Sequence, residues 1–238
     1  FKTSLDVSYV GNVGRHLIQR RQLNAFPYGT NFQGNAYDAS APDIPLPANF
    51  LRPIRGYGDI GYIEFSSTSN YNSMQTRVNR RFSRSFTFGM SWTWSKALDL
   101  VDNATSYVNP FLDYRMRNYG KAGFDRTHNM SINYIYRFPQ FSRRWRNGFS
   151  RKVLDGWELS GVTRFQSGAP LGFSYSMVTS TDLTGTSGVS GVDSRVILLD
   201  NPNLPKSERT IYRHFRTEVV KPPERASYGI GNAPKDPI

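Results

Sequence analysis

The sequence predicts an all-β fold built from long antiparallel strands, and three observations lead to this prediction. Apolar and polar residues alternate along five segments, as side chains do on the two faces of a β-strand. The connections between these segments differ greatly in length. Aromatic residues make up 14% of the chain although its mean hydropathy is −0.53, so the apolar mass is concentrated in Phe, Tyr and Trp. Disordered chains are poor in aromatic residues, which argues against disorder.

The first two strands are predicted over residues 1–10 and 59–82. In the second of these, the alternation is clean from residue 71 onward and weaker before it. Only the tripeptide 83–85 separates this strand from the next one, and so short a connection predicts a tight hairpin.

The third strand, over residues 86–96, has one face that is almost entirely large and apolar. That face carries Phe86, Phe88, Met90, Trp92 and Trp94, whereas the residues between them are Gly, Ser and Thr. Two further strands with the same alternation are predicted over residues 126–138 and 156–167.

The remaining stretches are predicted to be loops. Those over 11–58, 97–125 and 168–238 are long, polar and rich in Gly, Pro, Asn and Ser. If the strands run antiparallel in chain order, all three long loops leave the same end of the sheet. The hairpin at 83–85 and a basic link at 139–155 then share the other end.

Two all-β architectures compete for this pattern, a soluble sandwich and a transmembrane barrel. Residues 86–94 span about 26 Å at about 3.3 Å per residue, close to the apolar band of about 25 Å in outer-membrane barrels. Sandwich strands are usually shorter, at about five or six residues. Short turns at one end and long loops at the other also favour the barrel.

The polar faces of the strands support the same choice. Charged and amide side chains there would lose their hydration in a dry core, whereas a wet lumen accepts them. The predicted lumen-facing residues are Arg77, Asn79, Arg81, Asn133, Arg137, Arg164 and Gln166. The predicted lipid-facing residues and aromatic girdle are Phe86, Phe88, Met90, Trp92, Trp94, Tyr134, Tyr136, Trp157 and Phe165. A subunit contact is the alternative environment for these aromatic side chains.

The net charge of +12, from 30 Lys and Arg against 18 Asp and Glu, admits nucleic acid, anionic lipid headgroups or an acidic ligand as partners. Basic residues cluster near the hairpin and in the link 139–155. A collar of cations and aromatic side chains at the headgroup level explains these clusters and the strands together. We therefore predict a lipid partner and no nucleic acid.

No catalytic residue, cofactor or metal site is predicted, and the chain is not expected to be an enzyme. It has no cysteine, and its three histidines are far apart in the sequence. GYGDIG at 56–61 matches a dinucleotide-binding pattern but precedes a strand instead of a helix. Asp99, Asp102 and Asp113 lack the spacing of a calcium loop.

Several blocks of the sequence resemble the barrel of TonB-dependent outer-membrane receptors of the Oar-like type, in which a carboxypeptidase-regulatory-like domain precedes plug and barrel. These blocks are DVSYVGNVGRHL (6–17), NYNSMQTRVNRRFSRSFTFGMSWTWSKALD (70–99), FDRTHNMSINYIYRFP (124–139) and LDGWELSGVTRFQSGAPLGF (154–173). The resemblance implies the outer membrane of a Gram-negative cell and energised transport of a bulky substrate. It also implies contacts with the lipid bilayer and lipopolysaccharide, the rest of the barrel, a plug and the TonB complex.

The five or six strands visible here are too few for a closed barrel, which needs at least about eight. We expect residues 1–238 to be a portion of a TonB-dependent-receptor-like barrel, with its ends inside a longer polypeptide. The long loops are expected to bind the substrate, a glycan or a peptide. The alternative function is a structural subunit of a surface or extracellular β-sheet assembly, in which copies complete one another's sheets.

Overall fold

The computed structural model divides the chain into two compact units. The described residues are 2–81, 85–111, 114–140, 142, 148–176, 182–186, 195–225 and 230–237. The first unit, here called the sheet unit, comprises Phe1–Asn12, Asn70–Ala97 and Asp125–Ala169. The second, here called the loop unit, comprises Val13–Ser69, Leu98–Phe124 and Pro170–Ile238. Both draw on segments that are distant in the sequence.

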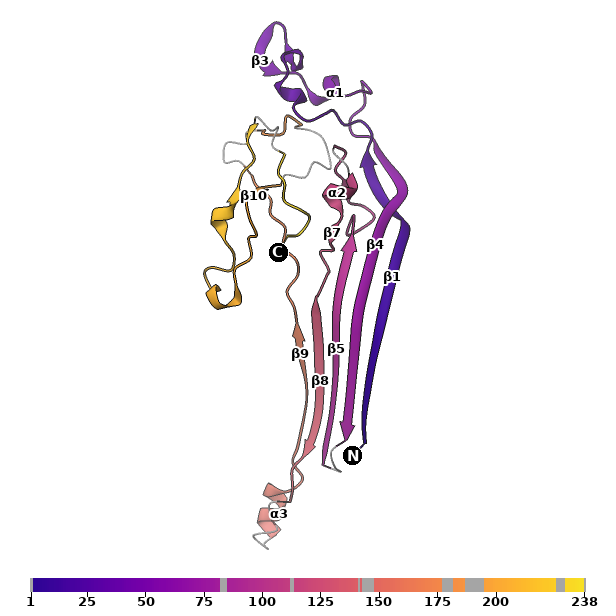
Figure 1. The fold of residues 1–238 in the computed structure, drawn as a ribbon, viewed down its shortest axis with the longest axis vertical. Helices are drawn as coiled ribbons and strands as arrows, with labels where there is room; N and C mark the ends of the chain where they lie inside the picture. The colour runs from indigo at the N-terminus through magenta and orange to yellow at the C-terminus, as the bar shows by residue number, and fades with distance from the viewer. Residues whose placement is uncertain are drawn as a thin grey trace. The chain divides into compact units, whose positions relative to one another are not determined.

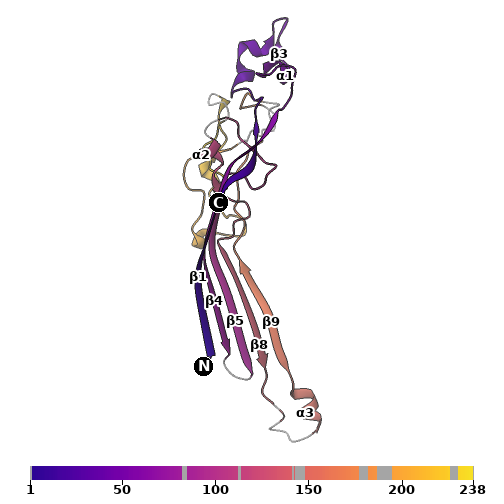
Figure 2. The ribbon, with the colours of Figure 1, turned by 90° about the vertical axis from the view of Figure 1, so that its right-hand side faces the viewer.

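Five long strands lie side by side in one sheet. They are β1 (Lys2–Gln22), β4 (Gly61–Arg81), β5 (Phe86–Asp99), β8 (His128–Arg137) and β9 (Glu158–Gln166). Neighbours in the sheet follow the order β1-β4-β5-β8-β9, and the arrows alternate in direction along it (Figure 1). Figure 2 shows the same five strands adjacent from a second direction. The arrangement is an up-and-down antiparallel meander, which is the connectivity of transmembrane barrels.

The first strand is longer than the sequence predicts. A loop is expected from residue 11, but β1 continues to Gln22. The alternation of apolar and polar residues fades there because Gln19 and Arg20 place polar groups on opposite faces. Backbone pairing does not require an apolar face, and side chains support it: Gln19 Nε2 donates to Glu64 Oε1 of β4 over 2.7 Å.

The stretches predicted as loops contain short elements. In the loop unit these are η1 (Thr30–Phe32), η2 (Gly34–Ala36), β2 (Tyr37–Asp38), β3 (Ala41–Pro45), α1 (Ala48–Leu51), β6 (Tyr107–Val108), α2 (Tyr114–Asn118), β7 (Gly120–Lys121), β10 (Ile197–Leu198), η4 (Lys206–Glu208), η5 (Thr217–Val219) and β11 (Val220–Lys221). In the sheet unit, α3 (Gly148–Leu154) lies in the link between β8 and β9 (Figure 2). No helix in the described part of the chain has the length and apolar character needed to cross a membrane.

Two of the short strands extend the long ones within the loop unit. β6 runs parallel to the end of β1, where Arg20 pairs with Tyr107. β7 runs antiparallel to the end of β5, where Leu98 pairs with Lys121. The other short strands form two separate two-stranded sheets, β10 with β11 and β2 with β3. The loop unit is therefore an ordered assembly of short pieces around the ends of long strands.

The buried apolar side chains lie almost entirely in the loop unit. There they are Phe26, Ala36, Leu100, Val108, Ala122, Val196, Leu204, Val219 and Ala233. Among the described residues of the sheet unit, Ala97 is the one buried apolar side chain. A sheet in a soluble protein buries at least one face in a core. The described residues of the sheet unit form no such core, and most of their apolar side chains are partly or fully exposed.

A buried asparagine organises the connection between β1 and β4. Asn24 is fully buried, and its Nδ2 donates to the carbonyls of Ile54, Tyr57 and Gly58 at 2.9 to 3.1 Å. Its Oδ1 accepts the Ile54 N–H at 2.8 Å. One buried amide side chain thus pairs with four backbone groups of the exposed turn at 54–58.

Some predicted features lie outside the described residues. They are part of the hairpin at 83–85, the side chain of Arg81, the backbone and side chain of Asp113, and part of the basic link at 139–155.

Candidate functional site

The strands of the sheet unit place the predicted aromatic residues on one side, here called the aromatic face. The β5–β8 register pairs Phe86 with Tyr136 and Phe88 with Tyr134. The β8–β9 register continues the face by pairing Met130 with Phe165. Since paired residues in a sheet project to the same side, this face holds Phe86, Phe88, Met90, Trp92, Trp94, Tyr134, Tyr136 and Phe165. Trp157 precedes β9, and its carbonyl accepts the Phe138 N–H at 3.0 Å, which extends the same pairing.

The aromatic face carries a cluster of rings at each end of β5. At its first residue, Phe86 lies edge-on to Tyr136, with ring centroids 5.9 Å apart. Near the other end, the ring of His128 stacks with Trp92 and Trp94, with centroids 5.9 and 6.5 Å apart. The two clusters are about 26 Å apart along the strand at about 3.3 Å per residue. At a strand tilt of about 40° this separation covers roughly 20 Å of membrane height, of the same order as the apolar band of about 25 Å in outer-membrane barrels.

The aromatic face remains open to its surroundings. Trp94 is 52% exposed, Trp157 is 61% exposed and Phe165 is 55% exposed. On the edge strand β1, Leu5 and Val7 are exposed to a similar extent. Full burial of an exposed apolar side chain is favourable by about 1.5–3 kcal/mol, so covering a side chain that is about half exposed contributes roughly half of that. A face this large and this aromatic is therefore suited to lipid or to another apolar surface.

The opposite side of the sheet unit, here called the polar face, carries charged and amide side chains. The register sets Arg164 across from Ser131 and Arg137 across from Glu158. Arg137 Nε lies 2.8 Å from Glu158 Oε2, and Arg164 Nε donates to Asn129 Oδ1 at 3.1 Å. These pairs are exposed, so water screens them and they contribute little to stability.

A hollow of about 520 Å³ lies on the sheet unit and is lined largely by polar residues of the polar face. Its lining includes Asp6 from β1, Arg77 and Asn79 from β4, Ser91 from β5 and Asn133 from β8. Of the predicted lumen-facing residues, Arg77, Asn79 and Asn133 therefore meet in one hollow. The others with described side chains, Arg137, Arg164 and Gln166, lie further along the polar face on β8 and β9.

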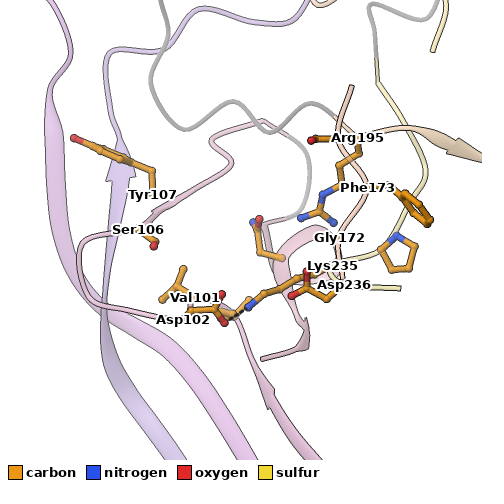
Figure 3. Close-up of a pocket in the computed structure, with 13 residues that line it drawn as sticks. Val101, Asp102, Ser106, Tyr107, Gly172, Phe173, Arg195, Lys235 and Asp236 are labelled. Atoms are coloured by element: carbon orange, nitrogen blue, oxygen red, sulfur yellow. Dashed lines mark hydrogen bonds and ion pairs between the residues drawn. The ribbon is translucent and has the colours of Figure 1, made fainter. Parts of the chain in front are cut away.

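The loop unit contains a second pocket, of about 370 Å³ (Figure 3). It is lined by Leu100, Val101, Asp102, Ser106, Tyr107, Asn118, Gly172, Phe173, Ser174, Arg195, Pro234, Lys235 and Asp236. These residues come from the chain that follows β5, the end of α2, the segment after β9 and two segments near the end of the sequence. Figure 3 shows Ser106 and Tyr107 on one side of the pocket and Arg195 and Phe173 on the other.

A lysine joins two carboxylates at the edge of this pocket. Lys235 Nζ lies 2.5 Å from Asp99 Oδ1 and 3.0 Å from Asp102 Oδ1. The side chains of Lys235 and Asp99 are largely buried, whereas that of Asp102 is 42% exposed. Asp102 Oδ1 also accepts the Gly123 N–H at 2.9 Å. The cluster ties the end of β5 to the segment that carries Lys235.

The two carboxyl groups differ in pKa although they share one lysine. Both lie in the loop unit, beyond the part of β5 that carries the aromatic face. Burial raises the pKa of Asp99 above its ordinary value, and the Lys235 ammonium opposes this rise without cancelling it. Burial acts in the same direction on Asp102, but the Gly123 N–H and Lys235 together outweigh it and hold the pKa of Asp102 below its ordinary value.

Arg195 forms the other cationic wall of the pocket and is nearly buried. Its Nη1 donates to the carbonyl of Arg117 at 2.6 Å and to that of Ala233 at 3.2 Å. The Ala233 N–H in turn donates to the carbonyl of Val196 at 3.1 Å. These hydrogen bonds fix the segment that contains Lys235 and Asp236 against its neighbours, so the pocket has a defined wall.

The sequence pattern singles out Asp99 and Asp102 but gives no sign of the cation that lies between them. The structure places the ammonium group of Lys235 there. In the described part of the chain, no group of three His, Asp or Glu side chains lies close enough to hold a metal ion. His128 is the first residue of β8, and its ring stacks with those of Trp92 and Trp94. His128 lies beside these rings because it pairs with Trp94 across the β5–β8 register. The pattern within one strand does not give this register, so the contact could not be predicted from the sequence.

The antiparallel meander of long strands and the two contrasting faces of its sheet are typical of a transmembrane β-barrel domain. Residues 1–238 match the family described as outer membrane beta barrel domain. The chain therefore belongs to that family, and the predicted all-β barrel fold and outer-membrane location are confirmed. Searches of curated proteins and of solved structures returned no match.

Proposed function

We propose that the chain forms part of the barrel of a TonB-dependent receptor of the Oar-like type, which binds a bulky substrate and transports it across the outer membrane. One observation carries the proposal: the sheet unit has an aromatic face and a polar face, and its described residues form no core of buried apolar side chains. Such a sheet is suited to separate lipid from a wet lumen. Among outer-membrane barrels, we propose the TonB-dependent receptors of the Oar-like type because four blocks of the sequence resemble them.

In this proposal the aromatic face meets the acyl chains, and its two ring clusters lie at the two headgroup levels. The cluster of Trp92, Trp94 and His128 then lies toward lipopolysaccharide, because the long connections leave the sheet at that end. The cluster of Phe86 and Tyr136 lies toward the periplasm. Amphipathic aromatic rings favour both levels.

The polar face is then the inner wall of the barrel. Its hollow presents Arg77, Asn79 and Asn133 to whatever fills the lumen. In a plugged receptor that filling is the plug domain, and arginines suit hydrogen bonds with carboxylates and carbonyl groups of such a domain. Transport would follow from movement of the plug, driven by TonB from the inner membrane.

The two edge strands of the sheet need further strands to pair with in a membrane. Among the described residues, β9 pairs with β8 on one side, and most of β1 pairs with β4. Unpaired backbone groups in lipid cost several kcal/mol each, so spanning sheets close into barrels. The rest of the barrel, or further copies of the chain in a structural assembly, would supply the missing partners.

Three measurements on the complete protein test this proposal. Native mass spectrometry in detergent should find one copy per barrel, because a transporter closes with its own strands; several copies per particle would favour the structural assembly. The purified periplasmic domain of TonB should bind the complete protein. A particle that binds no TonB and conducts ions steadily in planar bilayers is an open pore, and that result would overturn the transport proposal.

A further inference from the structure

We propose that the loop-unit pocket binds an uncharged carbohydrate, a proposal that rests on the receptor function and names its class of substrate. The volume of about 370 Å³ lies within the range of ligand pockets, about 300–1,000 Å³. All of its walls belong to one compact unit, and Arg195 donates both to the Ala233 carbonyl beside the C-terminal wall and to the Arg117 carbonyl in α2. The pocket is therefore present before a ligand arrives.

The charges that line the pocket compensate one another. Two acidic side chains, Asp102 and Asp236, face two basic ones, Arg195 and Lys235. Lys235 already forms ion pairs with the carboxylates of Asp99 and Asp102. An anionic ligand would have to draw Lys235 away from these carboxylates, and a cationic ligand would have to displace it. A neutral ligand requires neither change.

The remaining polar groups of the lining suit hydroxyl groups. The carboxylates accept hydrogen bonds, the amide of Asn118 can both donate and accept, and the hydroxyls of Ser106 and Ser174 can do the same. A sugar hydroxyl is likewise both donor and acceptor, so one ring can satisfy several of these groups at once. The rings of Phe173 and Phe215 lie edge to face, 5.8 Å apart. Phe173 thus offers a fixed apolar surface for the C–H side of a sugar.

Peptide ligands are favoured less by this lining. Peptides are usually recognised by strand addition along an exposed sheet edge, or by apolar pockets for their side chains. The lining of this pocket is instead a short list of polar groups brought together from five segments, with Leu100, Val101, Phe173 and Pro234 as its larger apolar members. Such a set favours a compact, hydroxyl-rich ligand over an extended chain.

Asp236 offers a clean variant for the test. Its φ is +48°, in the left-handed region, which Asn tolerates about as well as Asp. Asp236→Asn therefore keeps the shape of the side chain and the backbone while it removes the charge. Asp200→Asn is the matched control, because Asp200 is an exposed residue of the same unit and does not line the pocket. Ser106→Ala supplies a second pocket variant that removes one hydroxyl.

The experiment applies the complete protein, in a detergent without a sugar headgroup, to an array of neutral, uronic-acid and sulfated oligosaccharides and to a peptide array. Neutral oligosaccharides should bind, and Asp236→Asn should weaken that binding by about fivefold to tenfold, because a hydrogen bond to a neutral amide oxygen is weaker than one to a carboxylate. Ser106→Ala should weaken it less, and Asp200→Asn should leave it unchanged.

Other outcomes overturn the proposal. Binding of sulfated or uronic-acid sugars alone would contradict an uncharged ligand, and binding of peptides alone would contradict a carbohydrate. If both pocket variants bind neutral sugars as well as the wild type does, the binding site lies outside this pocket. Because the array needs no TonB, its result is separate from the transport test: sugar binding without a TonB interaction would leave this inference standing and remove the transporter.

Discussion

Tyr134 on β8 lies directly across from Gly161 on β9, and its ring occupies the space where a side chain at Gly161 would project. A Cβ atom at Gly161 would come within 2.6 Å of the Tyr134 hydroxyl and 2.8 Å of its Cζ. Packing an aromatic ring over a cross-strand glycine covers the exposed backbone of a β-sheet. The pair therefore holds β9, an edge strand of the sheet unit, against β8.

Replacing this glycine should weaken the sheet. In Gly161→Ala the new methyl group forces the far end of the Tyr134 ring aside, and because this face is open the loss should be about 1 kcal/mol, the low end of the range for overpacking. Urea unfolding of the protein in detergent measures the loss. The control is Gly168→Ala, because a Cβ at Gly168 meets no atom within 4 Å. If the two variants unfold alike, the ring does not contribute through this contact.

The proposed lipid and lumen faces predict opposite responses to charge at neighbouring positions. Met90 belongs to the aromatic face, near the middle of the spanning part of β5, and Ser91 belongs to the polar face. Met90→Arg should destabilise the folded barrel by about 2–4 kcal/mol, the range for arginine on the lipid face at the bilayer midplane. Ser91→Arg should be tolerated, because its guanidinium would reach the wet lumen.

The readout for this pair is folding into lipid vesicles, followed by the shift in gel mobility between the folded and heat-denatured forms. The two substitutions introduce the same side chain one residue apart, so each controls for the other. Equal loss of folding in both variants would contradict the assignment of the faces. A larger loss in Ser91→Arg would reverse it.

The strands and their faces could be predicted from the sequence because a period of two residues is a local signal. Phe86 and Trp94 lie on one face of β5 whatever their partners are. The end of β1 could not be predicted in this way, since Gln19 is held by Glu64 on another strand. The stacking of His128 with two tryptophans likewise depends on register, which a single segment does not encode.

The loop-unit pocket could not be predicted from the sequence, because its walls are held together by contacts between residues that are far apart in the chain. Lys235 lies 136 residues from Asp99 along the chain, and Arg195 lies 78 residues from the Arg117 carbonyl that it binds. Composition predicts only that the long loops are polar. The choice of partner for each polar group depends on tertiary packing, which brings these segments together.

The buried amide of Asn24 should control the order of the connection between β1 and β4. In Asn24→Asp, a carboxylate replaces the amide group that donates to three carbonyls, and each buried polar group left without its partner costs about 1–3 kcal/mol. Limited proteolysis should then cut residues 23–60 faster, while the sheet unit keeps its heat-dependent gel mobility. Asn35→Asp is the control, because Asn35 is exposed; equal cleavage of both variants would contradict the role of Asn24.

The lysine that joins Asp99 and Asp102 predicts a stability difference that depends on pH. Lys235→Met leaves two neighbouring carboxylates without their shared cation, so the variant should be less stable than the wild type at pH 7. The pKa of Asp102 is lowered in the folded protein, so its contribution to stability is present above its unfolded value of 3.8 and is lost as the pH falls below it. The pKa of Asp99 is raised, so that group acts in the opposite direction: its contribution is largest at low pH and is lost as the pH rises through its folded pKa.

Two changes reduce the advantage of Lys235 between pH 7 and pH 4. In the wild type, Asp99 is protonated before Asp102 because its pKa is raised, and the lysine then loses one of its two ionised partners. In Lys235→Met, protonation relieves the repulsion between the two carboxylates. The difference in urea midpoint between the two proteins should therefore shrink from pH 7 to pH 4. Lys206→Met, which changes an exposed lysine of the same unit, should show a small difference at both values. A difference for Lys235→Met that stays constant or grows toward pH 4 would contradict the pairing of Lys235 with ionised Asp99 and Asp102.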